Sequence, residues 1–386
     1  MNPPPANLPS IKLTVGGEFF SRLEAIRGLA AMMVAVAHSL IVLEDGGWQR
    51  QVREGLLVLF NGRAAVTLFF VLSGFVLGMA LRRGHGGFLG EYLRFAFRRV
   101  FRIYPAFLAV LALVLVYLVL FHEDRHYPGT SAWFQRYYHE PVTATLVVRN
   151  FLLLDHSLND VTWTLQSELL CSLLLPILHF VSIRLRPWAR GLLFVSLLVC
   201  PLFLPIGSCF YLFMFYLGYL LPEIGPSLMA FLNSIRCGRS LMLLLAGAGY
   251  FGARWIKWPV MGSYLLETVS GAFLICCVLY GVELRAYRLL DHPIVKFYGR
   301  ISYSFYLLHF FCLFLVSLLF LKWVPEELLS GHTLWFGWFL WLASTAVATP
   351  LAWLSYVAIE KPAIRFSKAV CATFVSERND RDSLRG

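Results

Sequence analysis

Long apolar runs recur along the whole chain and constrain its fold more than any other feature of the sequence. The segment Leu29–Ala37 has no polar side chain, and several runs approach the roughly 20 apolar residues that a helix needs to cross a bilayer. Such segments must be helical, because lipid offers no hydrogen-bond partners to a bare backbone. With 59% hydrophobic and 14% charged residues, the 386-residue chain could not hide its apolar surface as a water-soluble domain. The sequence predicts an all-α, polytopic transmembrane helical bundle.

The predicted spans number about ten, at about 26–43, 62–81, 104–121, 162–183, 191–206, 208–222, 240–256, 262–282, 301–321 and 334–357. Residues 1–20 read as a polar N-terminal segment without a cleavable signal peptide, 21–366 as the transmembrane domain and 367–386 as a charged, mobile cytoplasmic tail. In the longest outer loop, about 122–161, the apolar piece 142–154 is too short to span. It predicts an interfacial or re-entrant helix.

The formal net charge of +11 is explained by membrane topology. Most of the 33 lysines and arginines fall in the loops that lie on the same side of the membrane as the N-terminus. Basic residues favour the cytoplasmic side of a membrane protein, so this bias predicts that both termini are cytoplasmic. The basic residues do not form a separate binding face, and no nucleic-acid partner is predicted.

Ionisable side chains inside the predicted spans are candidate functional groups, because burying them in a bilayer is costly. His179 lies near the inner end of its span and favours an interfacial role. Glu267 lies near the start of its span and is expected to bond a neighbour. His309 is either a polar tie between helices or a functional group. The five candidates are His38, Glu168, His179, Glu267 and His309.

The pair Arg27 and His38 gives the sharpest functional signal. Eleven residues separate them, so on a helix they share one face and lie about 16 Å apart along the axis. Such a pair can hold an anionic donor at the cytoplasmic surface with the arginine and reach the donor's reactive end with the imidazole. The alternative is a neutral, buried histidine bonded to a facing helix.

Two further polar groups flank predicted spans. Arg99 and Arg102 share a helical face at the inner membrane edge, where they suit either phosphate binding or simple anchoring. The segment Trp163–Glu168 opens a span from the outer side and brings a carboxylate inside. The carboxylate of Glu168 needs a partner, so it orients His38, binds a substrate hydroxyl or pairs with an arginine for structure.

A match to the H-E-x-x-H zinc signature occurs at His122–His126. That signature requires one helix to present both imidazoles, together with a third ligand. Here Tyr127-Pro128-Gly129 breaks the chain directly afterwards, and nothing fixes a third ligand. No metal site is predicted.

Taken together, these motifs resemble the acyltransferase 3 family of bacterial membrane proteins. Arg27 and His38 match its Arg-x10-His spacing, and Trp163 to Glu168 resembles its Trp-Ser/Thr-Leu-x-x-Glu element. The remaining matches are Leu23–Ala31, Phe69–Phe75, Arg98–Pro105, Ile301–His309 and Glu360-Lys361-Pro362. The resemblance covers about residues 20–366. The chain departs from it at Gln166-Ser167, which leaves the role of Glu168 less defined, and we do not expect the hydrolase-like domain that some members append.

The resemblance implies a multi-pass O-acyltransferase of the bacterial inner membrane. It implies acyl-CoA, usually acetyl-CoA, as co-substrate with no bound cofactor, and a hydroxyl of a lipid-linked or extracytoplasmic glycan as acceptor. Catalysis would involve His38 and Glu168, and donor binding Arg27, Arg98, Arg99 and Arg102. Acceptor-binding or structural polar roles would fall to Trp163, Ser302, Tyr303 and His309. Membrane lipids are the remaining partner.

Two other function classes compete with this interpretation. A transporter or exporter of a small or glycan-type solute could use the same polar residues along its path, although the spans show no internal repeat of the kind that many transporters carry. A zinc enzyme acting at the outer surface would depend on the signature at His122–His126.

Overall fold

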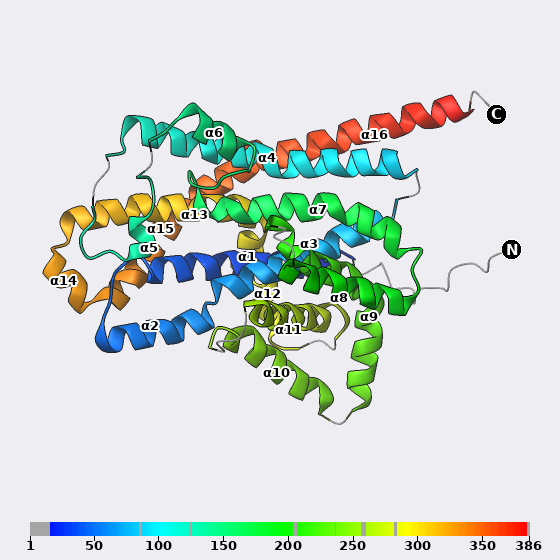
Figure 1. The fold of residues 1–386 in the computed structure, drawn as a ribbon, viewed down its shortest axis with the longest axis horizontal. Coiled ribbons are helices and arrows are strands. Elements are labelled where there is room, and N and C mark those ends of the chain that lie inside the picture. Colours follow the sequence, from blue (N-terminus) through cyan, green and yellow to red (C-terminus); the bar gives the residue numbers. More distant parts are fainter. Residues whose placement is uncertain are drawn as a thin grey trace.

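The computed structural model describes residues 16–84, 87–123, 126–139, 141–203, 207–235, 237–255, 260–281 and 284–383. These residues form helices and connecting loops without a β-strand, as predicted (Figure 1). The helices are α1 (Gly16–Leu40), α2 (Gly47–Leu59), α3 (Gly62–Leu81), α4 (Phe88–Leu120), α5 (Ala132–Gln135), α6 (Ala144–Phe151), η2 (Asp160–Thr162), α7 (Trp163–Ser182), α8 (Pro187–Phe203), η3 (Gly207–Tyr211), α9 (Leu212–Ser234), α10 (Gly238–Gly252), α11 (Val260–Tyr280), α12 (Tyr287–Asp291), α13 (Pro293–Trp323), α14 (Glu326–Gly331), α15 (Thr333–Ser355), η4 (Tyr356–Glu360) and α16 (Lys361–Ser383).

Eight helical segments of the described residues are long and apolar enough to cross a membrane. They are Ser21–Leu40, Gly47–Leu81, Phe88–Leu120, Asp160–Ser182, Gly207–Ser234, Met261–Tyr280, Pro293–Trp323 and Thr333–Thr373. The predicted spans 191–206 and 240–256 correspond to the shorter apolar helices Pro187–Phe203 and Ser240–Gly252. The polytopic all-α class is therefore confirmed, whereas a count of ten would require these two helices to cross as well.

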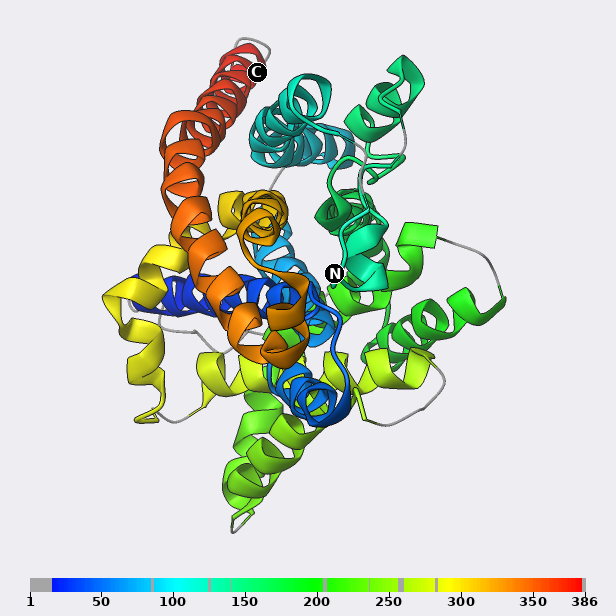
Figure 2. The ribbon, with the colours of Figure 1, turned by 90° about the vertical axis from the view of Figure 1, so that its left-hand side faces the viewer.

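Many apolar side chains cover the outside of the bundle. On α4, Leu113, Val116 and Val119 point outward with exposed side chains, as Trp335 and Phe339 do on α15. Such a surface is stable in contact with lipid and unstable in contact with water. Figure 2 shows α4 and α16 at one edge of the bundle and α10 at the opposite edge.

Two glycines allow α1 and α13 to cross in direct backbone contact. A Cβ at Gly28 would lie 2.5 Å from the amide nitrogen of Gly299, and a Cβ at Gly299 would lie 2.6 Å from the carbonyl oxygen of Glu24. Only residues without a side chain permit this approach. The crossing therefore fixes α1, which carries His38, against α13.

A second close crossing joins α3 to α9. A Cβ at Gly74 would lie 2.0 Å from the carbonyl oxygen of Phe215, and one at Gly218 would lie 2.0 Å from the carbonyl oxygen of Val71. These distances leave no room for a methyl group. The Phe69–Phe75 motif is thus a helix-packing element.

The ends of the bundle differ in structure. At one end, which we call the His38 end, α1 finishes and α2, α5 and α14 lie at the left of Figure 1. At the other end, which we call the α16 end, α4 begins and α16 projects at the right. The predicted short helix within 142–154 is present as α6.

The predicted C-terminal tail, 367–386, is described as part of helix α16, which runs to Ser383; its mobility stays a prediction. Just before the predicted tail, Phe366 packs against Phe101 of α4 with tilted rings whose centroids lie 5.4 Å apart. No proline or glycine occurs between Ala363 and Ser383 to end the helix. Residues 1–15 of the predicted N-terminal segment and residues 384–386 lie outside the described part of the chain.

Candidate functional site

The imidazole of His38 faces the interior of the bundle and contacts a second imidazole. Its Nδ1 lies 3.2 Å from Nε2 of His309 on α13, and the two rings stack with centroids 5.3 Å apart. His309 is buried, whereas His38 keeps part of its surface accessible. The tie between helices that the sequence allowed for His309 is therefore present, and its partner is His38.

The hydrogen bonds of this pair fix which nitrogens carry protons. Nδ1 of His309 lies 2.6 Å from the carbonyl oxygen of Tyr306, which can only accept, so this nitrogen donates. In neutral His309 the other nitrogen, Nε2, then carries a lone pair and accepts a hydrogen bond from Nδ1–H of His38. This assignment leaves Nε2 of His38 with a free lone pair, which is the requirement for a base.

Two aromatic rings flank the imidazole of His38. The ring of Trp133 on α5 lies 5.2 Å from the imidazole, and the ring of Phe310 lies 6.0 Å away, edge-on. The sequence did not identify Trp133 as a site residue, because it lies 95 positions from His38 in a loop. Its only signal was the density of aromatic residues in that loop.

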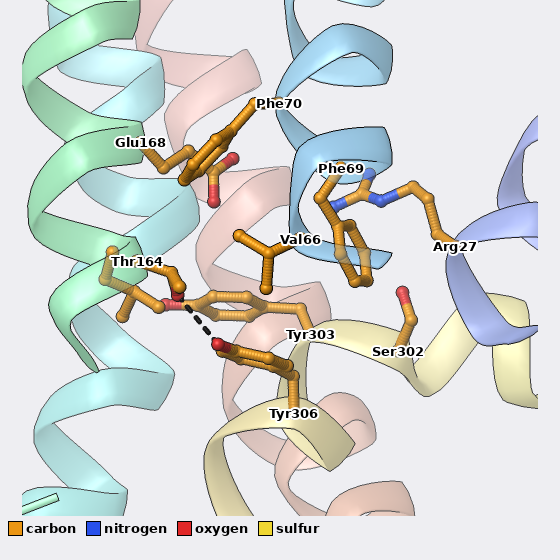
Figure 3. Close-up of a pocket in the computed structure, with 10 residues that line it drawn as sticks. Arg27, Val66, Phe69, Phe70, Thr164, Glu168, Ser302, Tyr303 and Tyr306 are labelled. Carbon is orange, nitrogen blue, oxygen red and sulfur yellow. Dashed lines mark hydrogen bonds between the residues drawn. The ribbon is translucent and has the colours of Figure 1, made fainter. Parts of the chain in front are cut away.

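Arg27 lines a narrow cavity on the α16 side of the histidine pair. The cavity has a volume of about 30 Å³ and is lined by Arg27, Val66, Phe69, Phe70, Thr164, Leu165, Glu168, Ser302, Tyr303 and Tyr306 (Figure 3). Arg27 enters from α1 and Glu168 from α7, on opposite sides of the cavity. Within the described residues Arg27 makes no ion pair or hydrogen bond, and its guanidinium lies 6.0 Å from the ring of Phe69.

Glu168 forms an ion pair with Arg99 and makes no contact with His38. A guanidinium nitrogen of Arg99 donates to Oε1 of Glu168 at 2.8 Å, and its Nε donates to Oγ of Ser172 at 3.2 Å. Ser73 donates to the same carboxylate oxygen at 3.4 Å. Of the three roles considered for this carboxylate, the structure shows pairing with an arginine, at the edge of the cavity.

A second ion pair joins Arg102 to Glu360. Oε2 of Glu360 also accepts a hydrogen bond from Oγ of Ser304 at 2.8 Å, and the carboxylate is almost fully buried. It ends a one-turn π-helix, η4, a distortion that often marks functional sites. Glu360 stands out in the sequence only as part of a motif, because its partner Arg102 lies 258 positions away.

The charges around the cavity leave one cation uncompensated. Glu168 and Glu360 balance Arg99 and Arg102, whereas Arg27 has no carboxylate partner within the described residues. An unpaired cation beside a cavity in a membrane protein is a strong attractor for an anion. Arg98, the fourth predicted donor-binding arginine, lies on the exposed surface of α4.

The other predicted polar residues divide into cavity and packing positions. Ser302 lines the cavity, and the hydroxyl of Tyr303 donates to the carbonyl oxygen of Ile103 at 2.6 Å. Trp163 lies outside the cavity lining and packs against Tyr211, with ring centroids 5.6 Å apart.

Two of the intramembrane candidates have structural partners outside this region. His179 contacts the hydroxyl of Tyr219 at 2.9 Å. Glu267 accepts hydrogen bonds from Asn61 at 3.1 Å and from Arg63 at 2.9 Å, as expected for a carboxylate bonded to its neighbours.

The described residues of the zinc-signature match, His122, Glu123 and His126, are not helical. Helix α4 ends at Leu120, and Nε2 of His122 contacts the carbonyl oxygen of Tyr138 at 2.7 Å. Asp124 and Arg125 lie outside the described residues. Among the residues that are described, no three His, Cys, Asp or Glu side chains gather in a metal-binding arrangement.

The cavity and the histidine pair meet at Tyr306. Its ring lines the cavity and its hydroxyl accepts a hydrogen bond from Oγ1 of Thr164 at 3.0 Å, while its carbonyl oxygen accepts one from Nδ1 of His309. A volume of about 30 Å³ holds one or two water molecules. A larger ligand that reaches His38 through this cavity must displace side chains such as those of Phe69 and Tyr306.

A comparison with protein families identifies the chain. The family model described as an acyltransferase domain, that of the acyltransferase 3 family, matches residues 20–357. Comparisons with curated proteins and with solved structures gave no significant match. Because the matched region covers nearly the whole bundle, including His38, Arg27 and the cavity between them, the chain belongs to the acyltransferase 3 family and is a multi-pass membrane acyltransferase.

Proposed function

We propose that this protein transfers an acyl group, acetyl in the first instance, from cytoplasmic acyl-CoA to a hydroxyl of a lipid-linked or extracytoplasmic glycan in a bacterial inner membrane. The observation that carries the proposal is the pairing of His38 with His309. It leaves a free lone pair on Nε2 of His38, a partly exposed side chain beyond a cavity that is lined by Arg27, which has no ion-pair partner among the described residues.

The distribution of basic residues supports an orientation for the transfer. The α16 end carries Arg82, Arg83, Arg94, Arg98, Arg184 and Arg186, which favours a cytoplasmic location for that end. Arg27 is then the residue nearer to the cytoplasm. His38 lies about 16 Å further along α1, towards the outer surface.

The charge distribution supports binding of the CoA phosphates at the α16 end. Arg27 has its full charge available, and Arg98 is exposed at the surface. Arg99 and Arg102 each pair with a glutamate through some of their guanidinium N–H groups. Because a guanidinium has five N–H donors, the remaining ones can bind the phosphates of the donor. The phosphates stay at the surface, and only the thin arm of the donor passes between the helices.

The geometry supports His38 as the general base. Its Nε2 accepts the proton of the acceptor hydroxyl while that oxygen attacks the thioester carbonyl carbon. The new C–O bond forms, the C–S bond breaks, and the proton passes to the departing CoA thiolate. During the step His309 accepts the hydrogen bond from Nδ1–H of His38 and stabilises the imidazolium.

The test is acyl transfer from labelled acetyl-CoA by purified full-length protein in lipid nanodiscs. The acceptor is the membrane glycolipid fraction from a strain that lacks the gene, and mass spectrometry identifies the product. Replacing His38 by Ala should lower the rate by about 10²–10⁴-fold. The control is His179→Ala, because that histidine bonds Tyr219 far from the cavity. No product with the unaltered protein, or full activity in His38→Ala, contradicts the proposal.

A quenched reaction distinguishes direct transfer from a two-step route. Direct transfer, as written above, leaves no acyl group on the protein. Mass spectrometry of protein mixed with acetyl-CoA alone should therefore detect no acetyl-His38. Detection of that adduct, formed and consumed fast enough for turnover, would replace the single step by an acyl-histidine intermediate.

A further inference from the structure

We propose that the loop around α5 forms the acceptor subsite, in which a saccharide ring lies against Trp133 beside His38. Arg136 and Asp160 provide its polar edge. This inference rests on the proposed acyl transfer to a glycan and names the residues that select the acceptor.

The position of Trp133 fits a platform next to the reacting atoms. Its ring centroid lies 5.2 Å from that of His38, and the two planes are inclined by 36°. Phe310 and Tyr137 support it from other sides, with ring centroids at 5.8 Å and 5.3 Å. Trp133 nevertheless remains partly exposed. A flat apolar face that is held by its neighbours and open to a ligand is what an aromatic stacking site requires.

Polar groups border this face. The hydroxyl of Tyr137 donates to Oδ2 of Asp160 at 2.7 Å, and Arg136 donates to both the Tyr137 hydroxyl, at 2.7 Å, and Oδ2 of Asp160, at 3.2 Å. Burial and the neighbouring Asp160 carboxylate raise the pKa of Tyr137, so its hydroxyl stays a proton donor. These bonds do not use Oδ1 of Asp160, and the Arg136 side chain is 55% exposed, with further N–H groups.

The loop is fastened to the end of the helix that carries His38. Leu43 and Thr130 form an antiparallel bridge, and the amide of Ser131 donates to the carbonyl oxygen of Val42 at 2.9 Å. Oγ of Ser131 donates to the carbonyl oxygen of Ile41 at 2.5 Å. The buried ring of Phe134 anchors the other face of α5. Trp133 is thus held in place before any ligand binds, which reduces the entropy cost of binding.

The chemistry of this surface matches a polyhydroxylated ring. The apolar face of a sugar stacks on an indole, and its hydroxyls can donate to a carboxylate and accept from a guanidinium. A purely anionic ligand would be repelled by Asp160, and a purely apolar one would leave both charged groups without a role. Helix α5 lies at the His38 end of the bundle (Figure 1), whereas Arg27 lies about 16 Å along α1 towards the α16 end, so donor and acceptor would approach the base from different ends.

The experiment measures the two substrates separately in nanodiscs, with labelled acetyl-CoA and the glycolipid fraction used above. Trp133→Ala should raise the half-saturating acceptor concentration by about 2- to 13-fold, the loss of one aromatic stacking contact. It should leave the KM for acetyl-CoA unchanged. Trp133→Phe should restore most of the acceptor affinity. Asp160→Asn and Arg136→Ala should also raise the half-saturating acceptor concentration.

The matched control is Trp335→Ala, which removes an indole that is 72% exposed on α15 at the same end of the bundle. If the half-saturating acceptor concentration is unchanged in both Trp133→Ala and Asp160→Asn, the proposed subsite is wrong. Faster acetyl-CoA hydrolysis in Trp133→Ala with unchanged acceptor affinity also overturns it, because Trp133 would then only exclude water. Absence of any transfer by the unaltered protein is a failure of the proposed function, which this design separates from a failure of the subsite.

Discussion

Replacement of His309 tests the mechanism most directly. The buried imidazole of His309 makes one hydrogen bond to the Tyr306 carbonyl and one to His38. It does not line the cavity that Arg27 lines. His309→Leu removes the acceptor for Nδ1–H of His38 and keeps a side chain of comparable bulk. The imidazole of His38 can then adopt the other tautomer or turn away from the reacting atoms.

The expected loss follows from the strength of this hydrogen bond. A bond between neutral partners contributes about 0.5–1.5 kcal/mol, and one from a charged donor about 1.5–3 kcal/mol. In the transition state His38 becomes an imidazolium, so the second range applies. At about 1.4 kcal/mol for each factor of ten, kcat should fall by roughly 10- to 150-fold. The fall should be smaller than that caused by His38→Ala.

The assay compares initial rates over a range of acetyl-CoA concentrations, with equal amounts of folded protein in nanodiscs. The KM for acetyl-CoA should stay within about twofold, because His309 does not line the cavity. His309→Gln should recover part of the rate, since its side-chain oxygen can accept the same hydrogen bond. A His309→Leu protein with the kcat of the unaltered enzyme would refute the tautomer argument. So would a loss that appears only in KM.

Three other perturbations address the donor site and the fold. Arg27→Ala should raise the KM for acetyl-CoA by roughly 10- to 150-fold, the loss of one charge-assisted bond, and an unchanged KM removes the residue from donor binding. Glu360→Gln leaves Arg102 without a charged partner and should lower the stability by about 3–5 kcal/mol, which thermal unfolding of detergent-solubilised protein would detect as a lower Tm. Gly74→Ala should prevent accumulation of folded protein, because its Cβ would overlap a backbone carbonyl. Gly247→Ala, in open space, should be neutral, and equal yields for the two variants would contradict the packing argument.

The fold class could be predicted because it depends on local properties of the chain. Apolar runs of sufficient length must form helices in lipid, whatever their neighbours are. The placement of Arg27 and His38 on one helix follows in the same way from their spacing. The extension of α16 to Ser383 is not evident from composition, because charged residues occur both in exposed helices and in tails, although nothing in that segment ends a helix.

The partners within the site could not be predicted from one sequence. His38 contacts His309 across 271 positions, and Arg102 contacts Glu360 across 258. Such pairs depend on which helices cross and on where along each helix the crossing lies. The Gly28–Gly299 contact fixes the crossing point of α1 and α13, but the sequence alone does not show that these two helices are neighbours. Glu168 illustrates the limit, since its three possible roles were equally compatible with its position in the chain.

Because backbone groups attach the α5 loop to the end of α1, the position of the loop and the chemistry of its side chains can change independently. Backbone hydrogen bonds at Val42 and Glu44 hold the loop, so its position does not depend on the identity of the side chains at Trp133 and Arg136. We therefore expect that the loop's side chains can be exchanged while the Arg27 cavity and the histidine pair keep their geometry. To change the acceptor specificity of this enzyme, we would start from a library of variants confined to those few loop positions.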